Sequence, residues 1–176
     1  MKRIISFLAV LLSLTALGQE VKYFTVVTEG VTGQKWIERL EFEGVKLSER
    51  AKQILLSDLF VPTSGRVVNL ALLTSKSLQD RRRTVYEAYD YAEANGLGEV
   101  QDIEVACMVA ERFSKDNLKA LGLSSIVVTH VPLFDFEEDD KFLLHFKTEP
   151  ERTMGHISYY EPRELDKEVG FLFEKK

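Results

Sequence analysis

The longest uninterrupted apolar pattern lies near the middle of the chain. Residues 105–110 are all apolar, and Ile103, Cys107 and Phe113 continue the same surface at helical spacing. A helix that is apolar on more than one side is usually buried on more than one side. We therefore predict a central helix that contains residues 103–113 and around which the rest of the chain packs.

A second helix is predicted immediately before the central one. Thr84 and Glu87 have the spacing of a capping box, in which the hydroxyl accepts from an early backbone N–H and the carboxylate reaches back. Apolar residues then recur at helical spacing as far as Ala92, and Asn95-Gly96 suits a left-handed stop. The pattern predicts a helix over residues 84–95.

Strand-like segments, rich in β-branched and aromatic residues and bounded by turn residues, lie on both sides of these helices. They cover residues 23–28, 66–73, 126–134, 142–146, 155–160 and 169–173. We expect Pro132 to mark where the third segment stops taking part in a ladder, because proline lacks the N–H. The acidic residues 135–140 are expected to connect the third and fourth segments as an antiparallel hairpin.

Three shorter helical segments complete the pattern. They are residues 36–42, residues 51–59 behind the N-cap Ser48, and a turn capped by Ser114 that ends at Leu121. Strands at both ends with helices between them define the α+β class. We predict an α+β fold with a mostly antiparallel sheet, in which the two central helices pack as a pair on one face.

The first residues have the layout of a cleavable secretory signal. Two cations precede the apolar run 4–14, and small residues stand three and one positions before a cut ahead of Gln19. The run is too short to favour a membrane-spanning helix. We predict a signal peptide over residues 1–18, a single α+β domain over residues 19–176, and a secreted or periplasmic protein with no stable membrane insertion after cleavage.

Charge and cysteine content narrow the partners of the mature chain. Removing the signal, which carries two cations, changes the formal charge from -5 to -7. Nucleic acid and anionic lipid both require clustered positive charge, so we expect an unknown protein or small-molecule partner and no nucleic acid. Cys107 is the only cysteine, which leaves no internal disulfide. It falls in the most apolar helix, where a thiol serves as packing material.

The histidines are the first candidates for chemistry. His130, His145 and His156 all lie in predicted strands, and neighbouring strands can bring imidazoles within reach of one ion. However, no two of them have a ligand spacing on one helix, and the acidic segment lacks the glycine and the final glutamate of an EF-hand. Nucleophile elbows, Walker loops and dinucleotide fingerprints are absent. We predict no metal site, no cofactor, and ordinary strand-face positions for the histidines.

The one basic run is the candidate binding surface. Arg81, Arg82 and Arg83 directly precede a predicted helix start, where the helix dipole disfavours cations. Tyr86 lies at the border of that helix's apolar stripe, and exposed tyrosine beside arginine is typical of recognition surfaces. These four residues are our predicted binding patch. The alternative is a solvated loop, with the tyrosine covering the edge of the core.

One segment carries a resemblance. Residues Gly122-Leu123 through Ile126, followed by His130-Val131-Pro132-Leu133-Phe134-Asp135, resemble a segment in a group of uncharacterised bacterial proteins. There, as here, a His-x-Pro-apolar-x-Asp strand follows a helix that ends in Gly-Leu. This chain departs from the group where residues 137–140 replace an expected glycine-containing turn. The resemblance implies a bacterial origin and makes His130 and Asp135 the candidate catalytic residues, with no activity attached.

Two functions remain open from the sequence. The first, which we favour, is an exported, non-catalytic binding or interaction module. The alternative is a small hydrolase or metal-dependent enzyme that uses His130 and Asp135. Histidine side chains that converge with an acid in a concave pocket would favour the enzyme, and dispersed side chains would favour the module.

Overall fold

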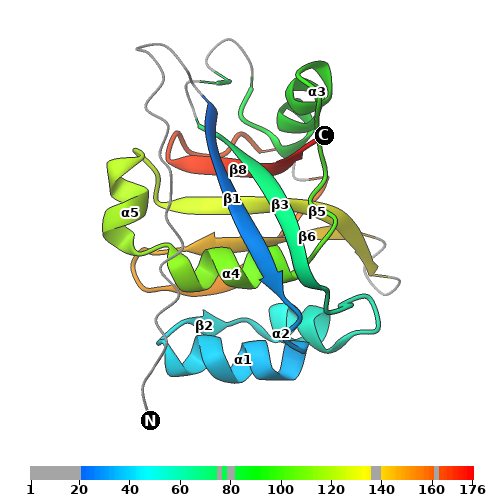
Figure 1. Cartoon of the computed structure of the whole chain (residues 1–176). Coiled ribbons are helices and arrows are strands. Elements are labelled where there is room, and N and C mark those ends of the chain that lie inside the picture. Colours follow the sequence, from blue (N-terminus) through cyan, green and yellow to red (C-terminus); the bar gives the residue numbers. More distant parts are fainter. Residues whose placement is uncertain (1–20, 75–76, 79–81, 136–139, 161–162) are drawn as a thin grey trace.

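The computed structural model describes residues 21–74, 77–78, 82–135, 140–160 and 163–176 (Figure 1), with only the backbone described for 133–135. These residues form one α+β domain. The predicted signal peptide and Arg81 lie outside the described residues. No helix in the described part of the chain is both long enough and apolar enough to cross a membrane.

All the predicted helical and strand segments are present. The helices are α1 (Gly33–Phe42), α2 (Glu49–Leu56), α3 (Val85–Ala94), α4 (Glu104–Arg112) and α5 (Lys115–Ala120). The strands are β1 (Val21–Glu29), β2 (Lys46–Leu47), β3 (Ser64–Leu73), β4 (Leu97–Gly98), β5 (Ser125–Asp135), β6 (Asp140–Lys147), β7 (Thr153–Ser158) and β8 (Val169–Lys175). The two-residue strands β2 and β4 carry no periodic pattern, so sequence analysis misses them.

The predicted N-caps are confirmed at three helices. In each case the hydroxyl accepts a hydrogen bond from a backbone N–H in the first turn, which satisfies a donor that the helix leaves unpaired. The pairs are Ser48 with Ala51 in α2, Thr84 with Glu87 in α3, and Ser114 with Asn117 in α5.

One mixed sheet holds the domain together. Its strand order is β1-β3-β8-β5-β6-β7-β2, and β4 pairs with the end of β8. Described neighbours run antiparallel except for the β5–β8 and β2–β7 pairs, which are parallel. The α+β class is therefore confirmed, but the predicted mostly antiparallel sheet is corrected to a mixed one. The reason is that the last strand, β8, inserts between β3 and β5 and runs parallel to β5.

The two central helices lie on opposite faces of the sheet. α4 packs with α1, α2 and α5 in one core, which takes Leu72 and Leu144 from the strands. α3 packs in a second core against Leu73 and Leu143, the residues adjacent to Leu72 and Leu144 on the same two strands. Successive strand residues point to opposite faces, so a sheet that is apolar on both sides requires cover on both. The predicted pairing of these helices on one face is wrong for this reason.

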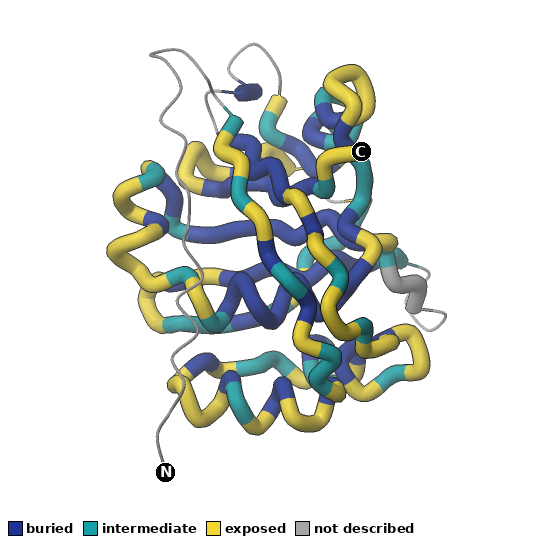
Figure 2. The backbone as a smooth tube through the Cα atoms, in the orientation of Figure 1, coloured by how far each residue is buried: buried dark blue, intermediate teal, exposed yellow. Residues whose placement is uncertain are grey.

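α4 is the buried centre that its apolar run predicts. Every residue from Glu104 to Ala110 is buried, and Figure 2 shows this burial together with that of the neighbouring strands. Cys107 is fully buried in the core that α1 and the sheet enclose. Burial raises the pKa of its thiol well above the ordinary value, which disfavours the reactive thiolate.

β5 does not stop at Pro132. The strand continues to Asp135, and the predicted antiparallel hairpin with β6 closes where Asp135 pairs with Asp140. The β5–β6 register shifts between Val128 and Leu133. A proline is tolerated in such an irregularity because its missing N–H removes no ladder bond there.

Candidate functional site

His130 links the two strands across this irregularity. Its Nε2 accepts a hydrogen bond from the backbone N–H of Leu144 at 2.9 Å, so the ring proton is on Nδ1, which donates to the carbonyl of Val131 at 2.7 Å. Burial lowers the pKa of the imidazole to about 4 and keeps the ring neutral near neutral pH. Both ring nitrogens bind backbone groups, so a catalytic role for His130 would require at least one of these hydrogen bonds to break.

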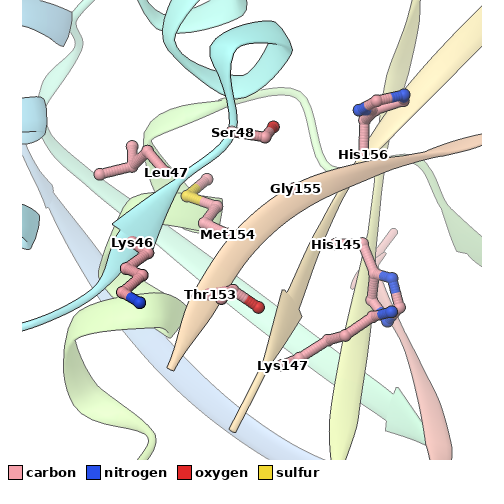
Figure 3. A pocket seen from close by; sticks show the side chains of 9 residues that line it. All are labelled: Lys46, Leu47, Ser48, His145, Lys147, Thr153, Met154, Gly155 and His156. Atoms are coloured by element: carbon pink, nitrogen blue, oxygen red, sulfur yellow. The ribbon is translucent and has the colours of Figure 1, made fainter. Parts of the chain in front are cut away.

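The other candidate residues do not gather around His130. Asp135 lies five positions further along β5, and its side chain is outside the described atoms. His145 and His156 point to opposite faces of the sheet, because His156 is the strand partner of Leu144 rather than of His145 (Figure 3). The described residues contain no group of three potential metal ligands. His145 and His156 do line one groove, but no described acidic residue lines it with them, and this favours the binding module over an enzyme.

The residues of the predicted basic patch differ in their exposure to solvent. Arg82 and Tyr86 are exposed, whereas Arg83 is half-buried and binds the segment before β8. The Arg83 guanidinium pairs with Glu164 at 2.8 Å and donates to the carbonyl of Leu165 at 3.2 Å. Arg83 therefore joins two parts of the chain, and the part of the patch that faces solvent in the described residues is Arg82 with Tyr86.

Tyr86 belongs to a larger group, Tyr86, Tyr89, Tyr159 and Tyr160, which we call the tyrosine surface. Ring centroids are 5.1 Å apart for Tyr89 and Tyr159, and 5.3 Å apart for Tyr159 and Tyr160. The Lys141 ammonium lies 5.9 Å from both of the last two rings. Burial, with smaller effects from neighbours that include Tyr86, raises the pKa of Tyr159. Tyr86 and Tyr160 are 62% and 58% exposed, so the group offers aromatic area to a partner.

A groove of about 330 Å³ lies on the sheet where β6, β7 and β2 meet (Figure 3). We call it the edge groove. Strand pairing places Lys46, Thr153 and Lys147 in one row across the three strands, and His145 and Gly155 opposite one another in the next row. Cross-strand partners share a face, so all five residues border the same hollow. Its volume is at the lower end for a small-molecule site.

The hollow exists because Gly155 has no side chain. A Cβ at this position would meet only the hydroxyl oxygen of Ser48, at 3.9 Å, among the described atoms. The backbone φ of Gly155 is also not positive. Neither backbone conformation nor packing within the described chain requires glycine here. Glycine inside a strand often marks the close approach of a ligand or of another backbone.

His145 forms the side of the edge groove next to the core. The residue is only 7% exposed, and its Nε2 is buried with no hydrogen-bond partner among the described residues. Burial, with a smaller contribution from the positive charge of Lys147, lowers its pKa to about 3, so the ring is neutral near neutral pH. An unpaired buried polar atom costs about 1–3 kcal/mol. A hydrogen-bonding ligand in the groove would remove that cost.

The charged side chains that line the edge groove are both cations, Lys46 and Lys147. Glu151 pairs with Lys46 at 2.5 Å but is not a lining residue. Ser48 uses its oxygen to accept from the Ala51 N–H, which leaves the hydroxyl proton for donation into the groove. The lining thus offers positive charge and hydrogen-bond donors, without a carboxylate pair or a thiol nucleophile.

Sequence analysis misses this groove. It assigns His145 to a strand face and Gly155 to a strand, which the structure confirms, but it cannot pair them because the strand register is unknown. β2 is too short to be recognised from the sequence, so its pairing with β7, which brings Lys46 and Ser48 to the groove, is not predicted. The one available signal is a glycine at a strand position that no turn explains.

No protein-family model, curated protein or solved structure matches the chain. The resemblance to uncharacterised bacterial proteins and the bacterial origin that it implies therefore stay predictions. Function has to be inferred from the edge groove, the tyrosine surface and the environment of the histidines.

Proposed function

We propose that the chain is an exported, non-catalytic binding module whose small-molecule ligand occupies the edge groove. The observation that carries the proposal is the unpaired, buried Nε2 of His145 across from Gly155, a strand residue without a side chain. The fold itself requires neither feature, because an unpaired buried nitrogen lowers stability and a glycine at position 155 leaves a hollow. A ligand that fills the hollow and bonds the imidazole accounts for both.

The same geometry argues against the hydrolase alternative. The imidazole of His130 is engaged by the backbone on both sides, and Asp135 lies at the far end of the strand. A pKa of about 3 makes His145 a poor general base near neutral pH, because efficient bases titrate close to the working pH. An enzyme of this kind would also use a carboxylate or a thiol beside the base, and the described groove lining contains neither.

Filling the groove tests the proposal. Gly155→Val adds a β-branched side chain that strands favour, in a place where a Cβ meets no close neighbour. The variant is expected to keep the unfolding midpoint of the unchanged protein and to lose its small-molecule ligands. A library of polar metabolites, screened by saturation-transfer NMR, measures this, with Thr25→Val on the exposed face of β1 as the matched control.

Two outcomes of that screen contradict the proposal. One is that no library compound binds the unchanged protein. The other is that the same compounds bind Gly155→Val and the unchanged protein equally well, which would place their site elsewhere.

Recognition of a protein partner is a second candidate function, favoured by the tyrosine surface. Tyr86 and Tyr160 present exposed rings from two separate parts of the chain, and Arg82 and Lys141 add positive charge. Aromatic residues and arginine dominate the energetics of interfaces. A partner that co-purifies with the unchanged protein is expected to be lost from Tyr86→Ala/Tyr160→Ala and kept by Gly155→Val. Equal retention by both variants would contradict this role.

Export is part of the proposal and has its own measurement. Protein recovered from outside the cytoplasm is expected to begin at Gln19 when its amino terminus is sequenced, because the signal layout places the cut there. Intact protein that begins at Met1 and stays in the cytoplasm would contradict export.

A further inference from the structure

We infer that the ligand of the edge groove carries an oxyanion, a phosphate or a carboxylate, which binds between the ammonium groups of Lys46 and Lys147. This inference rests on the proposed function and narrows it to one chemical class. It rests on the charge, the hydrogen-bond donors and the size of the groove.

The two lysines flank the middle strand of the groove. Lys46 on β2 and Lys147 on β6 are both strand partners of Thr153 on β7. Neighbouring strands are about 4.8 Å apart, so the two backbones are separated by roughly 10 Å. Each lysine side chain is long enough to bring its ammonium to a group held over Thr153. One oxyanion can therefore meet both charges at once.

Competition from the protein's own carboxylates is weak. The Lys46 and Glu151 side chains are 69% and 49% exposed, and exposed pairs of this kind contribute little to stability. A ligand oxyanion that meets both lysines replaces this single contact with two. The chain as a whole has a formal charge of -5, yet the groove lining contains no acidic residue, so the positive charge there is a local feature.

Hydrogen-bond donors supplement the charges. The hydroxyls of Ser48 and Thr153 line the groove, and the neutral ring of His145 donates from Nε2 when its proton is on that nitrogen. Oxyanions accept several hydrogen bonds at once, which matches a lining rich in donors. The Nε2 atom is covered from solvent, so we expect the exposed Lys147 side chain to change rotamer when the ligand enters.

The lining also sets what the groove rejects. The two positive charges repel a cationic ligand, and a neutral polar ligand would form no ionic contact with either ammonium group. The volume of about 330 Å³ suits a small metabolite rather than a polymer. The inferred ligand is thus a small phosphorylated or carboxylated molecule.

Titration of the 15N-labelled protein with inorganic phosphate and with citrate, at constant ionic strength set by sodium chloride, tests the inference. The amide resonances of His145, Thr153 and Gly155 are expected to shift saturably, with a dissociation constant of about 1 mM or lower for at least one probe. Comparison of the two probes shows whether phosphate or carboxylate is preferred. Lys147→Gln is expected to weaken binding by about tenfold or more, because one of the two charges is lost.

Lys22→Gln is the matched control. It removes another exposed positive charge, from β1 at the opposite edge of the sheet, and is expected to leave the titration unchanged. Equal weakening by Lys22→Gln and Lys147→Gln would show a general charge effect and overturn the inference.

The same experiment separates failure of this inference from failure of the proposed function. If neither anion shifts the groove resonances, but a neutral compound shifts them and loses this effect in Gly155→Val, the ligand class is wrong and the binding function stands. If no compound of any charge shifts them, both are wrong.

Discussion

The indole Nε1 of Trp36 donates a 3.0 Å hydrogen bond to the carboxylate of Glu104, a residue 68 positions later in the chain. The backbone N–H groups of Gly30 and Val31 donate to the same carboxylate at 3.2 and 3.0 Å. Glu104 is 1% exposed and begins α4, so protein donors rather than water satisfy its charge. This carboxylate therefore fastens the central helix to the connection between β1 and α1.

Glu104→Ala is expected to lower the free energy of unfolding by about 3–5 kcal/mol, because it leaves buried donors without an acceptor. Urea unfolding followed by tryptophan fluorescence measures the loss. Glu93→Ala, an exposed carboxylate on α3, is the control and should change stability by less than about 0.5 kcal/mol. Comparable losses from the two variants would contradict the role given to Glu104.

A double-mutant cycle tests the Trp36 contact separately. Trp36→Phe removes the indole donor and keeps an aromatic ring in the core. Combined with Glu104→Ala, it is expected to reveal a coupling energy of about 1–2 kcal/mol. Urea unfolding of all four proteins is followed by circular dichroism, because Trp36 is the only tryptophan. Strict additivity of the two changes would show that the hydrogen bond contributes nothing to stability.

Gly33 is required by close packing of α1 on α2. A Cβ on Gly33 would come within 1.7 Å of the carbonyl oxygen of Leu55, which is backbone and cannot rotate away. Gly33→Ala is therefore expected to cost about 3 kcal/mol or more of stability, although alanine is the better helix former. Thermal unfolding compares it with Gln34→Ala, the exposed neighbour, which should be close to neutral. A neutral Gly33→Ala would mean that the two helices are further apart than described.

Cys107 should react with thiol reagents only when the domain unfolds. The side chain is fully buried, and its raised pKa disfavours the thiolate. Labelling by a chromogenic disulfide is expected to be negligible in buffer and to follow the urea unfolding transition. Fast labelling of the folded protein would contradict the burial of α4 and reopen the question of a cysteine nucleophile.

Stability is expected to fall as the pH is lowered below about 6.5. The pKa values of His130 and His145 are about 4 and about 3 in the folded domain, against 6.5 for an ordinary histidine. Between these limits the unfolded chain binds protons that the folded chain does not, so acid favours unfolding. The stability that the neutral histidines contribute is fully present above pH 6.5 and is lost as the pH falls to their pKa values in the folded domain. For His130 this contribution is about 3 kcal/mol.

Urea unfolding at about pH 7.5 and about pH 5 measures this dependence. His130→Gln keeps a side chain that can hydrogen-bond Leu144, and it should remove roughly half of the loss between these two pH values. A free energy of unfolding that is the same at both values would show that the histidines are not buried as neutral rings.

Much of the fold can be predicted from patterns within short segments of the sequence. The predictions that proved wrong concern how distant segments are arranged relative to one another. The apolar run of α4, the caps at Ser48 and Thr84, and the β5–β6 hairpin depend on neighbouring residues, so they can be predicted. The insertion of β8 beside β5 and the separation of α3 from α4 by the sheet depend on contacts between distant segments. No pattern within a single segment encodes these contacts.

The candidate site was less accessible to sequence reasoning. A His-x-Pro motif draws attention to His130, but the structure uses this ring as a backbone link at a register shift. His145 and Gly155 have nothing unusual in their local sequence, and their importance arises from being opposite one another on β6 and β7. Burial and pairing, rather than residue type, distinguish the two histidines.

The two buried histidines are assigned different roles: His130 links two strands, and we propose that His145 faces a ligand. A long-range 1H–15N spectrum of the histidine rings, recorded before and after addition of phosphate or citrate, tests this assignment most directly. We expect His130 to stay a neutral ring protonated at Nδ1 and not to respond, while the nitrogen signals of His145 shift. A response from His130 with no change in His145 would show that both roles are wrong.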